Sequence, residues 1–138
     1  MNIEKILIVE DEENERTGLA ELISAWGYRT ETARDGVEGL EKIESFDPGI
    51  VVTDLKMPRL DGMELLERIS EHPTEIAVIL LTAQGSIDAA VAAMKLGAYD
   101  FIEKPVNPTR LRNILQNAAR QRGTERRGIR DRRSRHVG

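Results

Sequence analysis

The sequence predicts an α/β fold, a doubly wound sheet of five parallel strands. Short β-branched apolar runs alternate along the chain with longer segments whose apolar residues recur at helical spacing, and this pairing occurs five times. Three of the runs are apolar at nearly every position, as in central parallel strands that are covered on both faces. Regular alternation with short connections predicts right-handed crossovers, with helices on both sides of the sheet.

The five strands are predicted from these runs. They span residues 5–9, 28–32, 49–53, 76–81 and 98–102. The first, third and fourth are the apolar ones and are expected in the centre of the sheet. The second reads Tyr-Arg-Thr-Glu-Thr, and this mixed composition suits an edge strand.

Helical periodicity and terminal residues define the helices. They are predicted over residues 13–25, 36–45, 62–71, 87–96 and 108–121. Gly27 is expected to end the first helix, and Gly97 the fourth. Asp35 and Ser86 stand where the second and fourth helices begin, and we expect both to act as N-caps.

Length and composition limit the class of protein. A chain of 138 residues fits one domain of ordinary size. It has no cysteine, which excludes disulfides, thiolate metal sites and cysteine nucleophiles. No apolar run approaches the roughly 18 residues of a membrane span, and the N-terminus lacks a basic-then-apolar signal segment. We therefore expect a cytoplasmic protein without membrane contact.

Charge is divided along the chain. Residues 1–118 contain 12 Lys and Arg against 22 Asp and Glu, whereas residues 119–138 contain 8 Arg against 2 acidic residues. The acidic body argues against nucleic-acid affinity of the folded part. We expect a folded domain over residues 1–121 and, over residues 122–138, a basic tail or linker remnant that is disordered or helical only at its start. DNA binding by this tail is the weaker alternative, because no aromatic residue is interleaved for base stacking.

Acidic residues follow two of the predicted apolar strands. Asp54 comes directly after the third strand, and Glu10 and Asp11 come directly after the first. Open parallel sheets place reactive groups at the carboxyl ends of their strands. Carboxylates gathered there repel one another unless a cation neutralises them. The pattern therefore predicts a Mg²⁺ site, with the backbone carbonyl of Lys56 as a further ligand.

Two more polar residues follow the fourth and fifth strands. They are Thr82 and Lys104. Carboxylates, a divalent cation, a hydroxyl and an ammonium are the groups needed to place a phosphoryl group on a carboxylate and hold it. Charge suggests the roles: Asp54 attacks as the nucleophile, Lys104 pairs with the phosphoryl oxygens, and Thr82 donates its hydroxyl. Asp11 binds Mg²⁺, and Glu10 assists directly or through water.

Five short motifs occur in register along the chain, between residue 4 and about residue 120. They are Glu10-Asp11, Asp54-Leu55-Lys56-Met57-Pro58, Gly62 in Leu60-Asp61-Gly62, Thr82-Ala83 and Lys104-Pro105. With these motifs the chain resembles the receiver domains of two-component response regulators. Within that family it looks most like the receivers of NtrC-type regulators, the activators of sigma-54 transcription.

The resemblance implies a fold, a reaction and partners. The fold is flavodoxin-like, (βα)5, with strand order 2-1-3-4-5. Asp54 would accept phosphate from a sensor histidine kinase, with slow Mg²⁺-dependent self-phosphorylation and self-dephosphorylation rather than enzymatic turnover. Thr82 and Phe101 would switch the domain between two states, and the Lys104–Pro105 bond would be cis. The face formed by the fourth helix, fifth strand and fifth helix would bind a second copy, and an output domain beyond this chain would control transcription.

Two other functions use similar residues. An aspartate-nucleophile phosphohydrolase also combines Mg²⁺, Asp, Thr and Lys on a parallel sheet. Such enzymes carry a second aspartate two residues after the nucleophile as the general acid, but here Lys56 occupies that position. A degenerate receiver that only binds proteins is the third alternative, although every expected polar residue of the site is present.

Several neighbouring residues have simpler interpretations. Asp61 and Gly62 are interpreted as a turn and helix start beside Asp54. Glu12, Glu13 and Glu15 are interpreted as helix-start charges that the helix dipole favours, rather than as metal ligands.

Overall fold

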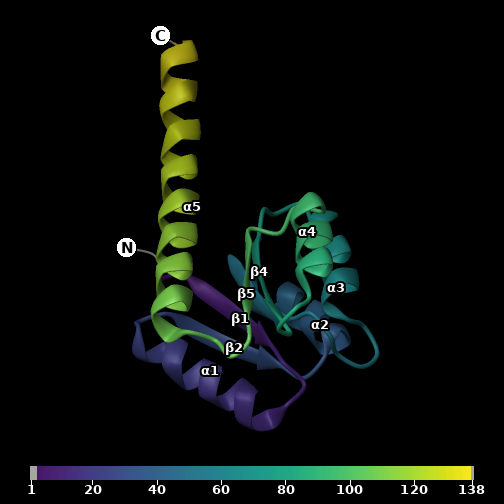
Figure 1. The fold of residues 1–138 in the computed structure, drawn as a ribbon. Coiled ribbons are helices and arrows are strands. Elements are labelled where there is room, and N and C mark those ends of the chain that lie inside the picture. Colours follow the sequence, from purple (N-terminus) through teal and green to yellow (C-terminus); the bar gives the residue numbers. More distant parts are fainter. Residues whose placement is uncertain (1–2, 138) are drawn as a thin grey trace.

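The computed structural model describes residues 3–137, with side chains described to residue 123. Five parallel strands form one sheet in the order β2-β1-β3-β4-β5, which confirms the predicted doubly wound topology (Figure 1). The strands are β1 (Lys5–Val9), β2 (Arg29–Ala33), β3 (Ile50–Asp54), β4 (Ala77–Thr82) and β5 (Asp100–Glu103). The helices are α1 (Glu13–Ala25), α2 (Gly36–Phe46), α3 (Gly62–Ser70), α4 (Ile87–Lys95) and α5 (Pro108–Val137).

Two apolar cores lie on the two faces of the sheet. Successive side chains of a strand point to opposite faces, so Ile6 and Ile8 of β1 pack in one core and Leu7 and Val9 in the other. Helices α1 and α5 cover the first core, and α2, α3 and α4 cover the second. The central strands are therefore buried on both sides, as their continuous apolar sequences predict.

The outer strands of the sheet lie where they are predicted, but one strand begins later than predicted. Strand β2 lies at one edge, as its mixed composition indicates, and β5 lies at the other. Strand β5 begins at Asp100, two residues later than predicted. The reason is the turn after α4: Gly97 has a φ of 105°, the amide of Ala98 bonds back to the carbonyl of Ala93, and the regular ladder starts only afterwards.

Helix ends agree with the predicted caps, with one difference. Asp35 caps α2, its Oδ1 accepting a 2.9 Å hydrogen bond from a first-turn amide, and Gly27 follows α1 at a φ of 100°. Asp61 caps α3 and forms a reciprocal capping box with Glu64, which confirms the predicted turn and helix start. Ser86 precedes α4 as predicted, but its side chain makes no capping hydrogen bond.

Helix α5 is longer than predicted. It continues past residue 121 to Val137 and extends beyond the sheet as a single rod (Figure 1). The basic tail that the sequence predicts from residue 122, disordered or helical only at its start, stays a prediction, as does the division between domain and tail at residue 121. Among the described residues, no helix has the length and apolar character to cross a membrane.

Candidate functional site

The predicted polar residues meet at one edge of the sheet. Strands β1, β3, β4 and β5 are adjacent and parallel, so their carboxyl ends open on the same side. Glu10 follows β1, Asp54 ends β3, Thr82 ends β4 and Lys104 follows β5. Residues that lie up to 94 positions apart in the sequence therefore come into hydrogen-bonding range.

Three carboxylates form the acidic part of the site. One oxygen from each of Glu10, Asp11 and Asp54 lies within 4.8 Å of the others. Glu10 is 1% exposed and Asp54 is 9% exposed, whereas Asp11 faces solvent. Carboxylate oxygens that lie this close together are suitable ligands for a hard divalent cation.

Lys104 holds the acidic part together. Its Nζ donates to Glu10 Oε1 at 3.1 Å, to Asp54 Oδ2 at 3.1 Å and to Glu15 Oε2 at 3.2 Å. Glu15 belongs to α1, so this contact was not expected from its interpretation as a helix-start charge. Glu12 fits that interpretation, because it is the N-cap of α1 and accepts from the amides of Asn14 and Glu15.

The crowding of charge alters three pKa values. Burial raises the pKa of Glu10 to about 7; a hydrogen bond from the Glu12 amide opposes the rise, and the charge of Asp54 adds to it. Hydrogen bonds with Glu10 and with Lys104 lower the pKa of Glu15. Burial alone would lower the pKa of Lys104, but its hydrogen bonds to Asp54 and Glu10 outweigh burial and raise it. Lys104 is therefore charged at neutral pH.

Thr82 brings a hydroxyl to the same edge. Among the residues that the structure describes, its Oγ1 is the one buried side-chain nitrogen or oxygen without a hydrogen-bond partner. The residue is 1% exposed, so bulk solvent does not reach the group. A buried hydroxyl without a partner costs about 1–3 kcal/mol of stability. Its position at the end of β4, beside the end of β3, favours donation of a hydrogen bond from the Thr82 hydroxyl to a group bound at this site.

A small cavity opens beside Asp54. Its volume is about 140 Å³, and it is lined by Asp54, Leu55, Lys56, Ala83, Ser86 and Lys104. The predicted ligand Lys56 thus lies at the site. Phe101 is half-buried and packs against the core that α2, α3 and α4 cover. The Lys104–Pro105 bond is cis, as the resemblance implies.

Two residues support the site through contacts that the sequence does not predict, although Gly62 is expected beside Asp54 as part of a turn and helix start. Arg16 of α1 donates from Nη1 to the carbonyl of Glu10 at 3.1 Å and to that of Asp11 at 3.4 Å. Gly62 approaches the backbone after β3 so closely that a Cβ atom would lie 2.5 Å from the carbonyl oxygen of Asp54. An arginine in a first helical turn and a glycine after an aspartate are common local patterns, and neither indicates which backbone atoms the residue approaches.

Comparison with known proteins gives the family. Residues 6–116 match the family described as response regulator receiver domain. The chain belongs to this family. It is a receiver domain of two-component response regulators, a signalling domain, and the resemblance in its motifs is confirmed.

Similar regulators support the narrower assignment to the NtrC-type group. The receiver domain is 43% identical over 115 residues to the nitrogen assimilation regulatory protein NtrX of Azorhizobium caulinodans, covering 82% of this chain and 25% of that protein. It is 36% identical over 116 residues to the regulatory protein AtoC of Escherichia coli, covering 84% of this chain and 25% of that protein. The chain therefore spans about a quarter of the length of these relatives.

Solved structures share the fold. The receiver domain of NtrX from Brucella abortus is 38% identical, with a TM-score of 0.78 and coverage of 82% of this chain and 96% of that one. A receiver domain protein from Clostridium thermocellum is 34% identical, with a TM-score of 0.84 and coverage of 88% and 98%. The match in β/α order and strand topology confirms the flavodoxin-like fold.

Proposed function

We propose that Asp54 is the residue on which this receiver domain accepts a phosphoryl group from a sensor histidine kinase. One observation carries the proposal: at the end of β3, Asp54 Oδ2 lies 3.1 Å from the ammonium of Lys104 and borders the cavity. The unpartnered hydroxyl of Thr82 stands at the end of the neighbouring strand. A nucleophile, a cation and a hydroxyl donor at one strand edge suit phosphoryl transfer to a carboxylate.

The carboxylates of Glu10, Asp11 and Asp54 fit a magnesium ion. Mg²⁺ prefers oxygen ligands, and the three carboxylate oxygens lie within 4.8 Å of one another. We propose these residues and the carbonyl of Lys56 as its ligands. When bound, Mg²⁺ supplies positive charge that offsets the repulsion between an attacking carboxylate and an incoming phosphoryl group.

The proposed reaction gives each side chain one task. An ionised oxygen of Asp54 forms a bond to phosphorus while the bond from phosphorus to the donor atom breaks, and the electron pair of that bond leaves with the donor. Lys104 pairs with a phosphoryl oxygen, and Thr82 donates its hydroxyl to another. A water oxygen later forms a bond to phosphorus while the bond from phosphorus to Asp54 breaks, which restores the carboxylate and releases inorganic phosphate. We expect self-phosphorylation and self-dephosphorylation both to be slow, so that the domain signals rather than turns over substrate.

Thr82 and Phe101 are the proposed switch. A phosphoryl oxygen would draw the Thr82 hydroxyl toward Asp54 and leave space behind it. Phe101, half-buried against the core on the α4 side, would then turn inward. Phosphorylation would in this way shift the population between two packings of β4, β5 and α4.

The reaction is tested by incubating the full chain with Mg²⁺ and acetyl phosphate and measuring intact mass. We expect a gain of one phosphoryl group, ~80 Da, that is absent in Asp54→Asn and prevented by a chelator. If no donor, including a histidine kinase, adds mass to the native chain, the degenerate receiver is the correct interpretation instead.

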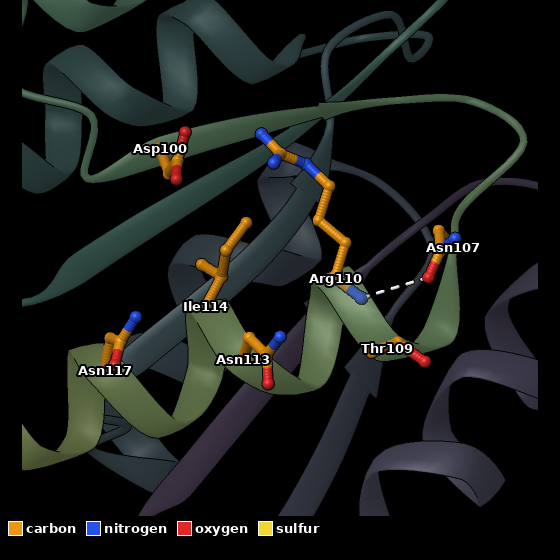
Figure 2. A pocket seen from close by; sticks show the side chains of 7 residues that line it. All are labelled: Asp100, Asn107, Thr109, Arg110, Asn113, Ile114 and Asn117. Carbon is orange, nitrogen blue, oxygen red and sulfur yellow. Dashed lines mark hydrogen bonds between the residues drawn. The ribbon is translucent and has the colours of Figure 1, made fainter.

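A homodimer through α4, β5 and α5 is the second part of the proposal. Apolar side chains are exposed along and after α4, namely Ile87, Val91, Met94 and Leu96. Beside β5 lies a pocket of about 510 Å³, in which Arg110 of α5 reaches toward β5 and Asp100 stands on the strand (Figure 2). In a two-fold interface a residue of one copy contacts a different residue of the other, and the same contact occurs a second time in reverse, so Asp100 of each copy can pair with Arg110 of the other.

The dimer is tested by sedimentation of the chain with and without acetyl phosphate and Mg²⁺. We expect phosphorylation to favour the dimer and Val91→Glu to prevent it, because the glutamate would place a charge in the apolar contact. Ile3→Glu is the matched control, since Ile3 is also an exposed apolar side chain but precedes β1. Equal dimerisation of the native chain and Val91→Glu would exclude this face.

A further inference from the structure

All three hydrogen-bond donors of the Lys104 ammonium have carboxylate partners. A lysine ammonium carries three N–H groups and no acceptor. Its contacts are Glu10 at 3.1 Å, Asp54 at 3.1 Å and Glu15 at 3.2 Å. The lysine therefore has no free donor for a phosphoryl oxygen, and pairing with one requires that a carboxylate be released.

The three carboxylates differ in how easily they can be released. The Glu10 side chain is 1% exposed, so water cannot replace the lysine as its hydrogen-bond partner. Asp54 is the proposed acceptor and stays at the reaction centre. The Glu15 side chain is 50% exposed, and water can replace the lysine there at little cost.

We propose that Glu15 is the carboxylate that Lys104 exchanges for the phosphoryl group, and that Glu15 thereby holds the lysine back in the unphosphorylated domain. The inference rests on the proposed phosphorylation of Asp54. Glu15 is then a positioning residue: it acts through Lys104 and competes with the phosphoryl oxygens for one N–H donor.

The position of Glu15 is fixed by the start of α1. The carboxylate of Glu12 accepts the amide hydrogen of Glu15 at 2.7 Å and caps the helix. The side chain of Glu15 thus reaches Lys104 from a rigid element, across 89 positions of sequence. Because the contact joins α1 to the residue after β5, exchange of Glu15 would also remove one of the contacts between α1 and the site when Asp54 is phosphorylated, while the Arg16 contacts stay in place.

The test measures how tightly the site binds beryllofluoride, an inorganic phosphoryl analogue, in the presence of Mg²⁺. We expect Glu15→Gln to bind it about 1.5- to 5-fold more tightly than the native chain, the range that a half-exposed ion pair contributes. Titration followed by amide NMR gives the affinity without any catalytic step. The fraction of chain that acetyl phosphate phosphorylates, measured by intact mass, should likewise be higher for Glu15→Gln than for the native chain.

Two further variants separate the contact from net charge. Glu13→Gln removes the same charge from the same helix turn, outside the three contacts of Lys104, and should bind beryllofluoride as the native chain does. Glu15→Asp keeps the charge but shortens the side chain, and should bind more tightly than the native chain. Equal affinities of Glu15→Gln and Glu13→Gln would overturn the exchange, as would Glu15→Asp binding no more tightly than the native chain. Failure of the native chain both to bind beryllofluoride and to gain phosphate would instead overturn the proposed function.

Discussion

At the scale of single residues, the site combines groups that stabilise the fold with groups that weaken it. Thr53 and Thr82 are both buried threonines at strand ends, yet Thr53 Oγ1 donates to the carbonyl of Asp54 at 3.0 Å and Thr82 Oγ1 has no partner. The same residue type therefore has opposite effects on stability at two adjacent strands. The sequence identifies both threonines, but only the surrounding atoms distinguish them.

Replacing Thr82 by valine should stabilise the unphosphorylated chain. The substitution keeps the shape of the side chain and removes a buried hydroxyl without a partner, so we expect a gain of about 1 kcal/mol in the free energy of unfolding. Urea denaturation measures it. Thr53→Val is the control and should lose about 1 kcal/mol, because it breaks a hydrogen bond. A Thr82→Val chain that is less stable than the native one would show that the hydroxyl is already satisfied.

A substitution at Gly62 tests how closely the start of α3 approaches the backbone of Asp54 and Leu55. A Cβ atom there would lie 2.5 Å from the carbonyl oxygen of Asp54 and 2.8 Å from the Cα of Leu55, and backbone atoms cannot rotate away. We expect Gly62→Ala to lower the free energy of unfolding by about 1–3 kcal/mol, as overpacking does. Gly18 lies in α1 with no atom within 4 Å of a built Cβ, and Gly18→Ala should stabilise by roughly 0.5–1 kcal/mol. Changes of the same sign in the two variants would contradict this account.

At the scale of elements, local sequence patterns predict helices and strands well and their ends less well. The periodicity of α1 and the apolar runs of β1 and β3 depend only on nearby residues, so their prediction is confirmed to within one residue. Strand β5 starts later because a turn after α4 takes two residues from it. Helix α5 continues past Ala118, the last buried residue of its apolar stripe among the described residues, so apolar periodicity does not mark where it ends. Capping residues show the same limit, since Asp61 caps its helix and Ser86 does not.

The two caps predict different costs of truncation. Asp61→Ala removes the side chain that accepts the Glu64 amide at 2.9 Å, and we expect a loss of about 1 kcal/mol in the free energy of unfolding. Ser86→Ala removes no capping bond and should change stability by less than about 0.5 kcal/mol. Urea denaturation of both variants checks the difference. A larger loss for Ser86→Ala than for Asp61→Ala would mean that α4 is capped in solution.

In the whole molecule, Arg122 joins α5 to residues that precede β1 and β4. This contact lies at the amino ends of the strands, opposite the carboxyl ends where the site is. Arg122 Nε lies 3.2 Å from Glu4 Oε2, and its Nη1 donates to the carbonyl of Glu75 at 2.8 Å. The Arg122 side chain is 13% exposed, so this is a largely buried pair. Gly49 makes room for it, because a Cβ at that position would collide with both side chains. The anchor fixes the direction in which the chain leaves the domain.

Breaking the anchor should loosen the end of α5. We expect Arg122→Ala to speed amide hydrogen exchange in residues 116–123, and a double-mutant cycle with Glu4→Ala to give a coupling of about 0.5–3 kcal/mol. Arg120→Ala removes an equal charge from an exposed position of the same helix and should change stability by less than about 0.5 kcal/mol. The same exchange rates in both single variants would show that the pair does not hold the helix.

Apolar periodicity and short motifs are properties of neighbouring residues, and they are sufficient to predict the fold class, the family and the places of Asp54, Thr82 and Lys104 at or just after strand ends. Which of these side chains have hydrogen-bond or ion-pair partners depends on the tertiary structure. Glu15 meets Lys104 across 89 positions and Arg122 meets Glu4 across 118. Such contacts depend on how β1, α1, β5 and α5 converge in space, so no local pattern encodes them. The identity of the polar residues in the site follows from the sequence, whereas the three carboxylates that contact Lys104 follow from the fold.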